Sequence, residues 1–474
     1  MKLARFGMYM AGFMAVVNIS VIYMALPSIE RGLHAGIADQ QWILSIYPLM
    51  EGGFTLACGT LGDLYGRKRI LTVTTWLFVL ATLACALAPT APLLIVARAV
   101  QGLGGAALLS LPVAILVQML PNPQENEDAI KAFSMIAGLG AVAGPVIGGV
   151  LVHWFGWPAV FYLSVVMGLV VLATFPAVTE NEPDPSLRLD GIGQFLAILS
   201  FLAVSFALIE GNANGWSSPI IMASFAVFAI GLALFIAVER RVKQPMVHLK
   251  YFKRRSFDVS LLVIGIVNFG WYGIMLLCTL FLQNVQHQTA IQAGFYLMPS
   301  NIAFFVANQY SSQVEKLIGQ RAIVALSFVV SLVGIAWLAI VGMNSPSWEV
   351  SAGLFVAGAG WGLIFTPAAS MGMSAVTAAD EGFASGAIAL SRSLFGVFGI
   401  AVLGSLLAAG IAHAVGNRVY HHSATTALSQ PASQAFVDGM HLAMVVCLVL
   451  TVIFGIAVSA LTPSKKTARE GASA

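Results

Sequence analysis

The sequence predicts an all-α integral membrane protein with fourteen transmembrane spans. Of its 474 residues, 59% are hydrophobic and only 9% are charged, whereas a soluble globular chain carries about 25% charged residues. Apolar windows of about 20 residues, the length that crosses the hydrocarbon core as a helix, occur fourteen times along the chain. Basic side chains gather between alternate windows, as expected of cytoplasmic loops. Lipid must therefore solvate most of this chain.

The predicted spans are, in chain order, 6–28, 42–62, 70–88, 93–117, 132–153, 157–178, 191–210, 218–238, 257–282, 291–312, 321–342, 350–373, 384–412 and 439–461. The first follows Lys2 and Arg5, as the apolar core of a secretory signal would. It is too long for such a signal and lacks a clear small-residue cleavage site. We therefore interpret it as a retained first span.

The charge bias predicts the orientation of the chain. Nineteen of the 23 Lys and Arg residues fall on the side that the two termini share, two fall on the opposite side, and two lie inside spans. Miscounting a single span would destroy this bias, which the positive-inside rule assigns to the cytoplasm. Both termini are predicted to be cytoplasmic, in a multi-pass protein of the cell (inner) membrane.

The connections are too short to build a soluble domain. The longest are 239–256 and 413–438, and we consider a short surface helix or hairpin for the second. The first contains seven cations, which topology alone explains, although binding of anionic lipid is an alternative. The net charge of +3 is no signal for a nucleic-acid partner in a chain of this class.

The stretch Gly59-Thr-Leu-Gly-Asp-Leu-Tyr-Gly-Arg-Lys-Arg69 joins the second and third spans. Glycines let the backbone fold tightly at the membrane surface, and the basic side chains stay in cytoplasmic water. The positive-inside rule does not require Asp63, which precedes Gly66, Arg67 and Lys68. A specific function is therefore predicted for this turn.

Two further patterns lie inside spans. Span 4 carries Arg98-Ala-Val-Gln-Gly, and an arginine deep in an apolar helix is costly unless it faces partners or a water-filled cavity. Arg98 is thus a functional candidate, with a purely structural clamp on backbone carbonyls as the alternative. In span 5, the pattern predicts close helix approach and a proline bend. Its residues are Gly140, Gly144, Pro145, Gly148 and Gly149.

Enzymatic and cofactor functions are not expected. The pairs Gly138-x-Gly140 and Gly102-x-Gly104 lie in mid-helix rather than after a strand, so they do not indicate nucleotide binding. Phosphate-cradling and hydrolytic motifs do not occur in the sequence. The four cysteines show no close pairing that would indicate a metal or redox site. A membrane transporter without an ATP site draws its energy from an ion gradient, so this is the energy source expected if the chain transports.

Glu51 is the candidate proton carrier. It lies about nine residues, or roughly 13 Å, into span 2 and hence close to the bilayer midplane. An ionisable residue at that depth is a functional candidate by default, because it could hold a proton in one access state and release it in another. The alternative is a protonated glutamate that hydrogen-bonds to a neighbouring helix.

The 59–69 turn, the Arg98 pattern and the span-5 glycines together resemble the signatures of the major facilitator superfamily, and the span-5 pattern resembles that of its antiporters. The sequence of residues 314–321 resembles that of residues 61–68. This internal similarity aligns spans 1–6 of the chain with spans 9–14. This layout resembles the fourteen-span drug:proton antiporter family. It implies a six-helix half at 1–180, two inserted spans and a basic linker at 181–256, and a second six-helix half at 257–474. By the resemblance, the inserted pair lies outside the transport path.

The first span departs from the family pattern, because Asn18 stands where an aspartate is common and Tyr23 replaces an asparagine. An amide cannot carry a proton, so Asn18 would orient substrate. Span 13 has no acid between Gly386 and Ile411, which disfavours doubly charged substrates. The candidate substrate-binding residues are polar positions in spans that the resemblance places around the cavity: Asn18, Tyr47, Glu51 and Gln101.

The resemblance implies a monomeric, proton-coupled transporter that exports lipophilic or cationic small molecules by alternating access. Glu51 and Arg98 would couple protons, and the candidate gate comprises Gly62, Asp63, Gly66, Arg67 and Lys68. In the outward-open state Asp63 would cap span 13 near 381–385. The alternatives are an exporter or uptake permease for an endogenous metabolite, such as an amino acid, sugar or siderophore, and a sensor that transports nothing. The span-5 pattern favours export.

Overall fold

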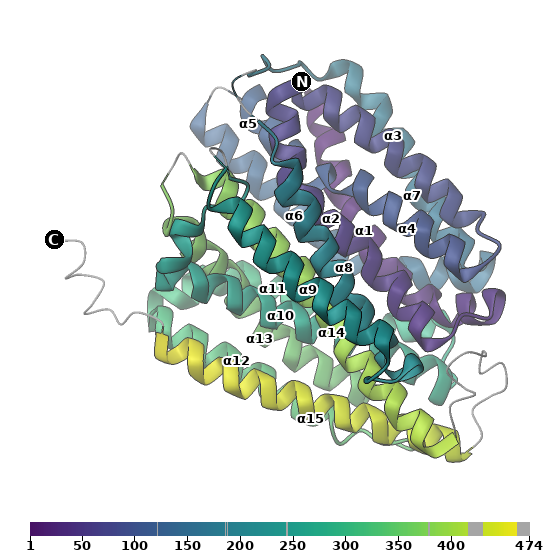
Figure 1. The fold of residues 1–474 in the computed structure, drawn as a ribbon. Coiled ribbons are helices and arrows are strands. Elements are labelled where there is room, and N and C mark those ends of the chain that lie inside the picture. Colours follow the sequence, from purple (N-terminus) through teal and green to yellow (C-terminus); the bar gives the residue numbers. More distant parts are fainter. Residues whose placement is uncertain are drawn as a thin grey trace. The chain divides into compact units, whose positions relative to one another are not determined.

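The computed structural model describes residues 1–120, 122–184, 186, 188–242, 245–377, 380–415 and 430–461. Within these residues the regular structure is helical and contains no strand (Figure 1). The helices form two compact units, which we describe separately. The predicted all-α class is confirmed.

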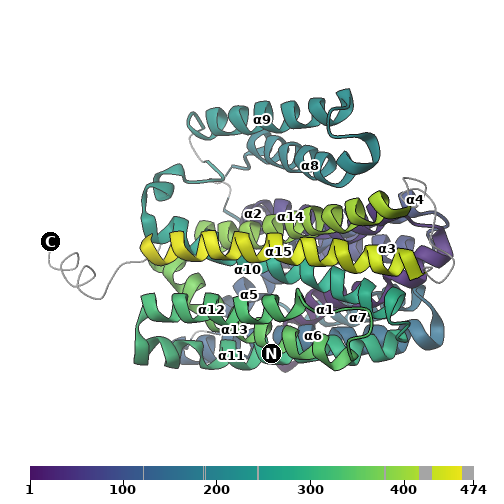
Figure 2. The same ribbon diagram turned by 90° about the horizontal axis from the view of Figure 1, so that it is seen from below.

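The first unit comprises Met1–Met246 together with the short segment Gln288–Gly294 among the described residues. Its elements are α1 (Lys2–Leu33), α2 (Ile37–Tyr65), α3 (Arg67–Ala86), α4 (Ala91–Gly105), α5 (Ala107–Met119), α6 (Pro123–Phe155), α7 (Pro158–Thr174), the 3₁₀ turn η1 (Phe175–Ala177), α8 (Gly191–Asn214) and α9 (Pro219–Glu239). The helices α8 and α9 pack against each other as a hairpin (Figure 2).

The second unit contains the remaining described residues from Val247 onward. Its elements are the 3₁₀ turn η2 (Leu249–Lys253), α10 (Arg255–Leu280), the π turn η3 (Phe281–Val285), α11 (Ala290–Ile318), α12 (Gln320–Leu338), α13 (Ser347–Ser374), α14 (Glu381–Val415) and α15 (Gln430–Leu461). The first residues of α11 belong to the first unit.

Each predicted span coincides with a helical segment, and thirteen helices of the described part are long and apolar enough to cross a membrane. The helix α2 is not among the thirteen, and it carries Asp39, Glu51 and Asp63. The fourth span is divided between α4 and α5 at Ala106, directly after Gly104 and Gly105, which weaken a helix. The last helix begins at Gln430 rather than 439, and residues 416–429 of the predicted outer stretch lie outside the described residues.

Helix pairing repeats between the two units. In the first, α1 packs on α6 and α7, and α3 packs on α4 and α7. In the second, α10 packs on α14 and α15, and α12 packs on α13 and α15. The turns between α2 and α3 and between α11 and α12 each contain a glycine with positive φ, 102° at Gly66 and 89° at Gly319. These parallels agree with the internal similarity of the sequence.

The interior of the first unit explains how its helices hold together. Apolar side chains from α1, α3, α5 and α7 form a shared core, which includes Met8, Met14, Phe78, Leu111 and Val171. The outer helix α9 instead exposes a row of large apolar side chains. A surface of this composition is stable in contact with lipid rather than water.

Candidate functional site

Arg98 lies on α4 at the centre of a buried polar network in the first unit. Its side chain is only 1% exposed. Nε donates a hydrogen bond to the Ile43 carbonyl at 3.1 Å, and Nη1 donates to Oε1 of Gln101 at 2.7 Å. The guanidinium carbon lies 4.5 Å from the centroid of the Tyr47 ring. Hydrogen bonds and the aromatic face offset part of the cost of burying this charge.

Gln101 extends the network to three further helices. Its Nε2 donates to Oδ1 of Asn18 on α1 at 3.1 Å and to Oγ1 of Thr82 on α3 at 2.7 Å. Ser164 on α7 also donates to Asn18 Oδ1, at 3.5 Å. The Nδ2 atom of Asn18 is buried and has no hydrogen-bond partner among the described residues. One strong donor in the network is therefore unused.

Glu51 lies one helical turn after Tyr47 on α2 and is 3% exposed. Its carboxyl group interacts electrostatically with Arg98. The structure thus brings together the predicted coupling pair, Glu51 and Arg98, and the other polar candidates, Asn18, Tyr47 and Gln101. Sequence reasoning missed Thr82 and Ser164, because small hydroxyl residues in apolar spans usually bond to their own helix backbone.

Glycines allow α4 to approach α2 closely at this network. A Cβ atom on Gly102 would lie 2.5 Å from the Tyr47 carbonyl oxygen, and one on Gly105 would overlap the Tyr47 hydroxyl. Larger residues at either position would push the two helices apart. The Gly-rich pattern that follows Arg98 therefore serves helix packing, and it fixes Tyr47 beneath the guanidinium.

The predicted gate residues lie together at the turn between α2 and α3. Asp63 and Arg67 form an ion pair at 2.8 Å, and Arg67 Nη1 donates to the Ala114 carbonyl of α5 at 3.2 Å. A Cβ atom on Gly62 would lie 2.7 Å from a methyl carbon of Leu111, so glycine permits this close approach. Gly66 provides the positive φ of the turn.

The segment after α7 caps this turn, a contact that sequence reasoning missed. The Glu180 carboxylate accepts hydrogen bonds from the backbone N–H groups of Lys68 at 2.8 Å and Arg69 at 2.9 Å. Asn181 Oδ1 accepts from the Arg67 N–H at 2.5 Å. An acidic side chain at a helix N-terminus satisfies unpaired donors and interacts favourably with the helix dipole. The only sequence signal was an acidic segment on the side predicted to be basic.

The span-5 pattern lies on α6. Gly140, Gly144 and Gly148 recur every fourth residue on one face against α1, and a Cβ atom on Gly148 would lie 2.8 Å from the Val21 carbonyl oxygen. Gly149 and Pro145 face the Gln288–Gly294 segment of the same unit. The predicted close helix approach is therefore observed in the first unit.

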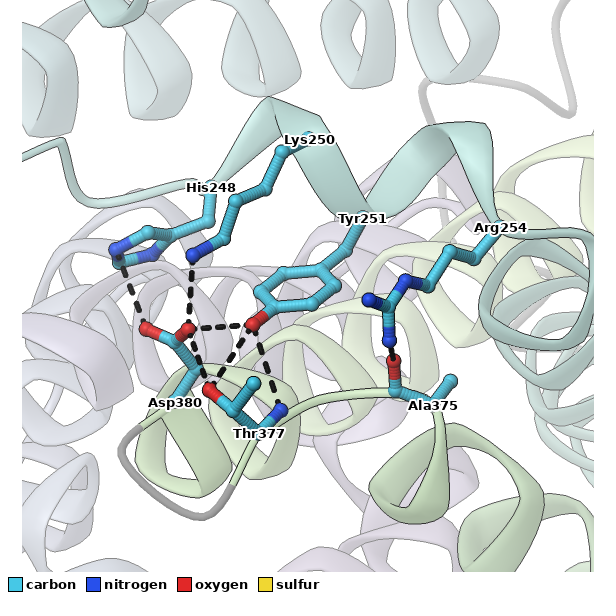
Figure 3. A network of polar contacts seen from close by, with 7 residues as sticks. All are labelled: His248, Lys250, Tyr251, Arg254, Ala375, Thr377 and Asp380. Atoms are coloured by element: carbon cyan, nitrogen blue, oxygen red, sulfur yellow. Dashed lines mark hydrogen bonds and ion pairs between the residues drawn. The ribbon is translucent and has the colours of Figure 1, made fainter. Parts of the chain in front are cut away.

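The second unit holds a separate polar network, which we call the linker clasp (Figure 3). It joins His248, Lys250, Tyr251 and Arg254 of the linker to Ala375, Thr377 and Asp380 before α14. Oδ2 of Asp380 accepts from Lys250 at 3.0 Å, from Thr377 at 3.0 Å and from the Tyr251 hydroxyl, and its Oδ1 lies 3.5 Å from His248 Nε2.

Two pKa shifts follow from the linker clasp. Hydrogen bonds from Tyr251 and Lys250 hold the pKa of Asp380 well below its usual range. The hydrogen bond to Asp380 in turn raises the pKa of Lys250. Sequence reasoning explained the linker cations by topology, and no local pattern connects Lys250 with an acid 130 residues away.

The sequence of the chain matches the family model of the Major Facilitator Superfamily over residues 8–400. It is 35% identical to the multidrug resistance protein Stp of Mycobacterium tuberculosis over 398 residues, which cover 84% of this chain and 74% of Stp. It is 32% identical to the drug efflux pump JefA of Mycobacterium tuberculosis over 407 residues, which cover 85% of this chain and 80% of JefA.

The fold resembles that of a solved bacterial homologue of the human lysosomal transporter Spinster in an inward-facing, unoccupied conformation. The TM-score is 0.66 at 14% identity, with 97% of this chain and 98% of the other covered. At this identity, the likeness concerns the fold alone. The helical spans, the signature turn and the match over most of the sequence agree that this multi-pass membrane protein belongs to the Major Facilitator Superfamily.

Proposed function

We propose that this protein is a proton-coupled exporter of lipophilic or cationic small molecules. Two of its relatives are the multidrug resistance protein Stp and the drug efflux pump JefA, and each matches most of the chain. Secondary transporters of this superfamily place their substrate and coupling-ion sites near the bilayer midplane. The buried network around Arg98 has the charged and polar groups that such a site requires.

The observation that carries the proposal is the pair Glu51 and Arg98. Both side chains are almost fully buried, and Glu51 lies one helical turn after Tyr47, whose ring centroid is 4.5 Å from the guanidinium carbon of Arg98. Protonation of Glu51 would remove the negative charge that compensates the guanidinium. The balance of charge in the network would then differ between the two protonation states, which is the requirement for coupling a proton to a conformational change.

The amides of Gln101 and Asn18 have different roles in this proposal. Gln101 uses Nε2 for two hydrogen bonds and Oε1 for Arg98, so it orients its neighbours. Asn18 keeps Nδ2 available, and a buried donor of this kind favours a substrate that carries an acceptor. Tyr47 adds an aromatic surface next to the charge, and apolar substrates with a polar group suit this combination.

The gate and the topology complete the proposal. Segments 1–180 and 257–474 would act as the two halves that rock during alternating access, in a monomer with both termini in the cytoplasm and the body in the inner membrane. The ion pair Asp63–Arg67 would act as the cytoplasmic latch. Support comes from its 2.8 Å distance and from the capping of the same turn by Glu180.

Substrate-induced proton release from energised inverted membrane vesicles tests the proposal. Lipophilic cations are added first and amino acids or sugars second, while a pH-sensitive dye reports the gradient. Export of drugs in exchange for protons predicts a response to the cations. A response to the metabolites alone would instead identify an exporter of endogenous compounds, and no response to either would contradict proton-coupled export.

A further inference from the structure

The inserted pair is attached directly to the helix that bears Glu51. Gln194 on α8 is 6% exposed, and its Nε2 donates a hydrogen bond to the Gly53 carbonyl of α2 at 2.5 Å. Ile198, one turn further along α8, is so close that a Cβ atom on Gly53 would lie 3.0 Å from its Cγ1. The helices α8 and α2 are therefore in close contact two residues beyond Glu51.

A second polar contact holds the other end of α8. The Trp42 indole Nε1 donates to Oε1 of Glu210 at 3.0 Å, and the Trp42 ring lies 6.3 Å from that of Phe206. Trp42 and Gly53 are eleven residues apart on α2, about 16 Å along the helix axis. Two anchors at this spacing fix α8 along α2.

The segment of α2 around Glu51 is intrinsically weak. Pro48 removes one backbone donor from the helix, and Gly52 and Gly53 lower its helical propensity. Within α2, the Thr55 hydroxyl donates to the Glu51 carbonyl at 2.6 Å. The Gly53 carbonyl accepts a hydrogen bond from Gln194 of α8, so another helix supports α2 where its own sequence makes it easiest to deform.

We infer that Gln194 is a positioning residue for Glu51 and that the α8–α9 hairpin is a brace for the proton-coupling segment of α2. The inference rests on the proposed function, because it assigns the inserted pair a role in the same proton site. This role differs from the one implied by the resemblance to the fourteen-span drug:proton antiporter family, which places α8 and α9 outside the transport path. Without the brace, the Glu51 carboxyl would no longer be held in one position relative to Arg98.

Several titratable groups surround this site within the first unit. Four of them interact electrostatically with Arg98 on α4: Cys85 from α3, Tyr47 and Glu51 from α2, and Tyr23 from α1. On the α8 side, Asp190 and Glu239 lie next to Gly193 at the base of the hairpin. Because Gln194 is uncharged and hydrogen-bonds to the backbone, its removal changes the position of Glu51 and adds no charge to this set.

The test measures the pH at half-maximal proton-coupled transport of the lipophilic cation tetraphenylphosphonium in proteoliposomes that contain the full chain. Gln194→Met keeps the length of the side chain and removes its donor without adding a titratable group. Ser200→Ala is the matched control, because it removes a buried hydroxyl of α8 that donates to the Leu196 carbonyl of its own helix. Hydrogen exchange of the 49–56 segment in the purified variants provides a readout that does not depend on transport.

We expect Gln194→Met to move the pH at half-maximal transport by about half a unit to one unit, the size expected for one lost hydrogen bond. Exchange in 49–56 should accelerate. Ser200→Ala should leave the pH midpoint and the exchange unchanged. Equal shifts in Gln194→Met and Ser200→Ala, or a wild-type midpoint and exchange in Gln194→Met, would overturn the inference.

The failure of the proposed function would look different. In that case the wild-type protein and Glu51→Gln would show the same proton response, and no pH midpoint would depend on Glu51. The inference would then fall together with the proposal. If Glu51→Gln abolishes coupling while Gln194→Met behaves as wild type, the inference alone fails.

Discussion

Arg98 donates a hydrogen bond from Nη1 to Oε1 of Gln101 at 2.7 Å, and this bond fixes which way the Gln101 amide points. With Oε1 committed to the guanidinium, Nε2 faces Asn18 on α1 and Thr82 on α3. The charge on α4 is thereby connected to α1 and α3. Any movement of Arg98 that accompanies protonation of Glu51 would be transmitted through Gln101.

Gln101→Leu should destabilise the protein by about 2–4 kcal/mol. The buried Arg98 guanidinium and the side-chain carbonyl of Asn18 each lose their hydrogen bond to the Gln101 amide. Thr82→Val is the matched control. It removes two neutral hydrogen bonds, one accepted from Gln101 and one donated to the Phe78 carbonyl of its own helix, and should cost about 1–2 kcal/mol. Thermal unfolding of the purified variants in detergent measures both effects. Equal unfolding temperatures for the two variants would show that the network does not depend on Gln101.

Asp63→Asn should impair transport with little effect on stability. The pair Asp63–Arg67 is partly exposed, with side-chain exposures of 40% and 28%, and such pairs contribute at most about 1 kcal/mol. As a latch, however, the pair would select one access state, so the variant should populate the inward-open state at rest. Labelling of single cysteines placed in the cytoplasmic cavity measures this shift. Wild-type labelling rates in a variant with impaired transport would argue against the latch.

Gly148→Ala should disturb the packing of α6 on α1, because the added Cβ would lie 2.8 Å from the Val21 carbonyl oxygen. Overpacking of this kind costs about 1–3 kcal/mol. Gly59→Ala is the control, since a Cβ added there would meet no other part of the described chain within 4 Å beyond its own helix backbone. It should be neutral or slightly stabilising. The unfolding temperatures of Gly148→Ala and Gly59→Ala are compared. Equal values would contradict a role of the glycine face in packing α6 on α1.

The linker clasp should respond to pH through Asp380 and Lys250. The folded pKa of Asp380 lies below the ordinary value of about 3.9, so its stabilisation is present above about pH 3.9 and is lost as the pH falls through the folded pKa. The folded pKa of Lys250 lies above about 10.4, so its contribution is present below that pH and is lost as the pH rises through the folded pKa.

Asp380→Asn should therefore lower the unfolding temperature at pH 7, and its difference from wild type should shrink as the pH falls below about 4. The exposed Glu182 provides a control, and Glu182→Gln should differ little from wild type at any pH. Thermal unfolding between pH 3 and pH 8 measures the difference. A difference for Asp380→Asn that is constant with pH would exclude the carboxylate as its source.

The sequence was sufficient to predict the helices and the position of the signature turn. Apolar windows of membrane-spanning length determine the helices, and a turn of this composition requires glycine, which explains the positive φ of Gly66. The cost of burying a charge also identified Arg98 as a residue with partners. These features depend on local composition, so a single sequence reveals them.

Partners that come from distant parts of the chain could not be predicted. Glu180 caps a helix that begins 113 residues earlier, at Arg67, and Lys250 binds an aspartate 130 residues away. Gln194 was overlooked because one polar residue near the end of a span is common, and its acceptor is a backbone carbonyl, which has no sequence signature. Only tertiary packing reveals these contacts.

We propose that Glu51 carries the coupled proton. The most direct test compares substrate exchange at equal pH with substrate transport driven by a pH gradient. Glu51→Gln mimics the protonated carboxyl in shape. In proteoliposomes, the variant should still exchange tetraphenylphosphonium across the membrane at equal pH on both sides, but it should lose transport driven by a pH gradient. Gradient-driven transport at the wild-type rate in Glu51→Gln would contradict the account.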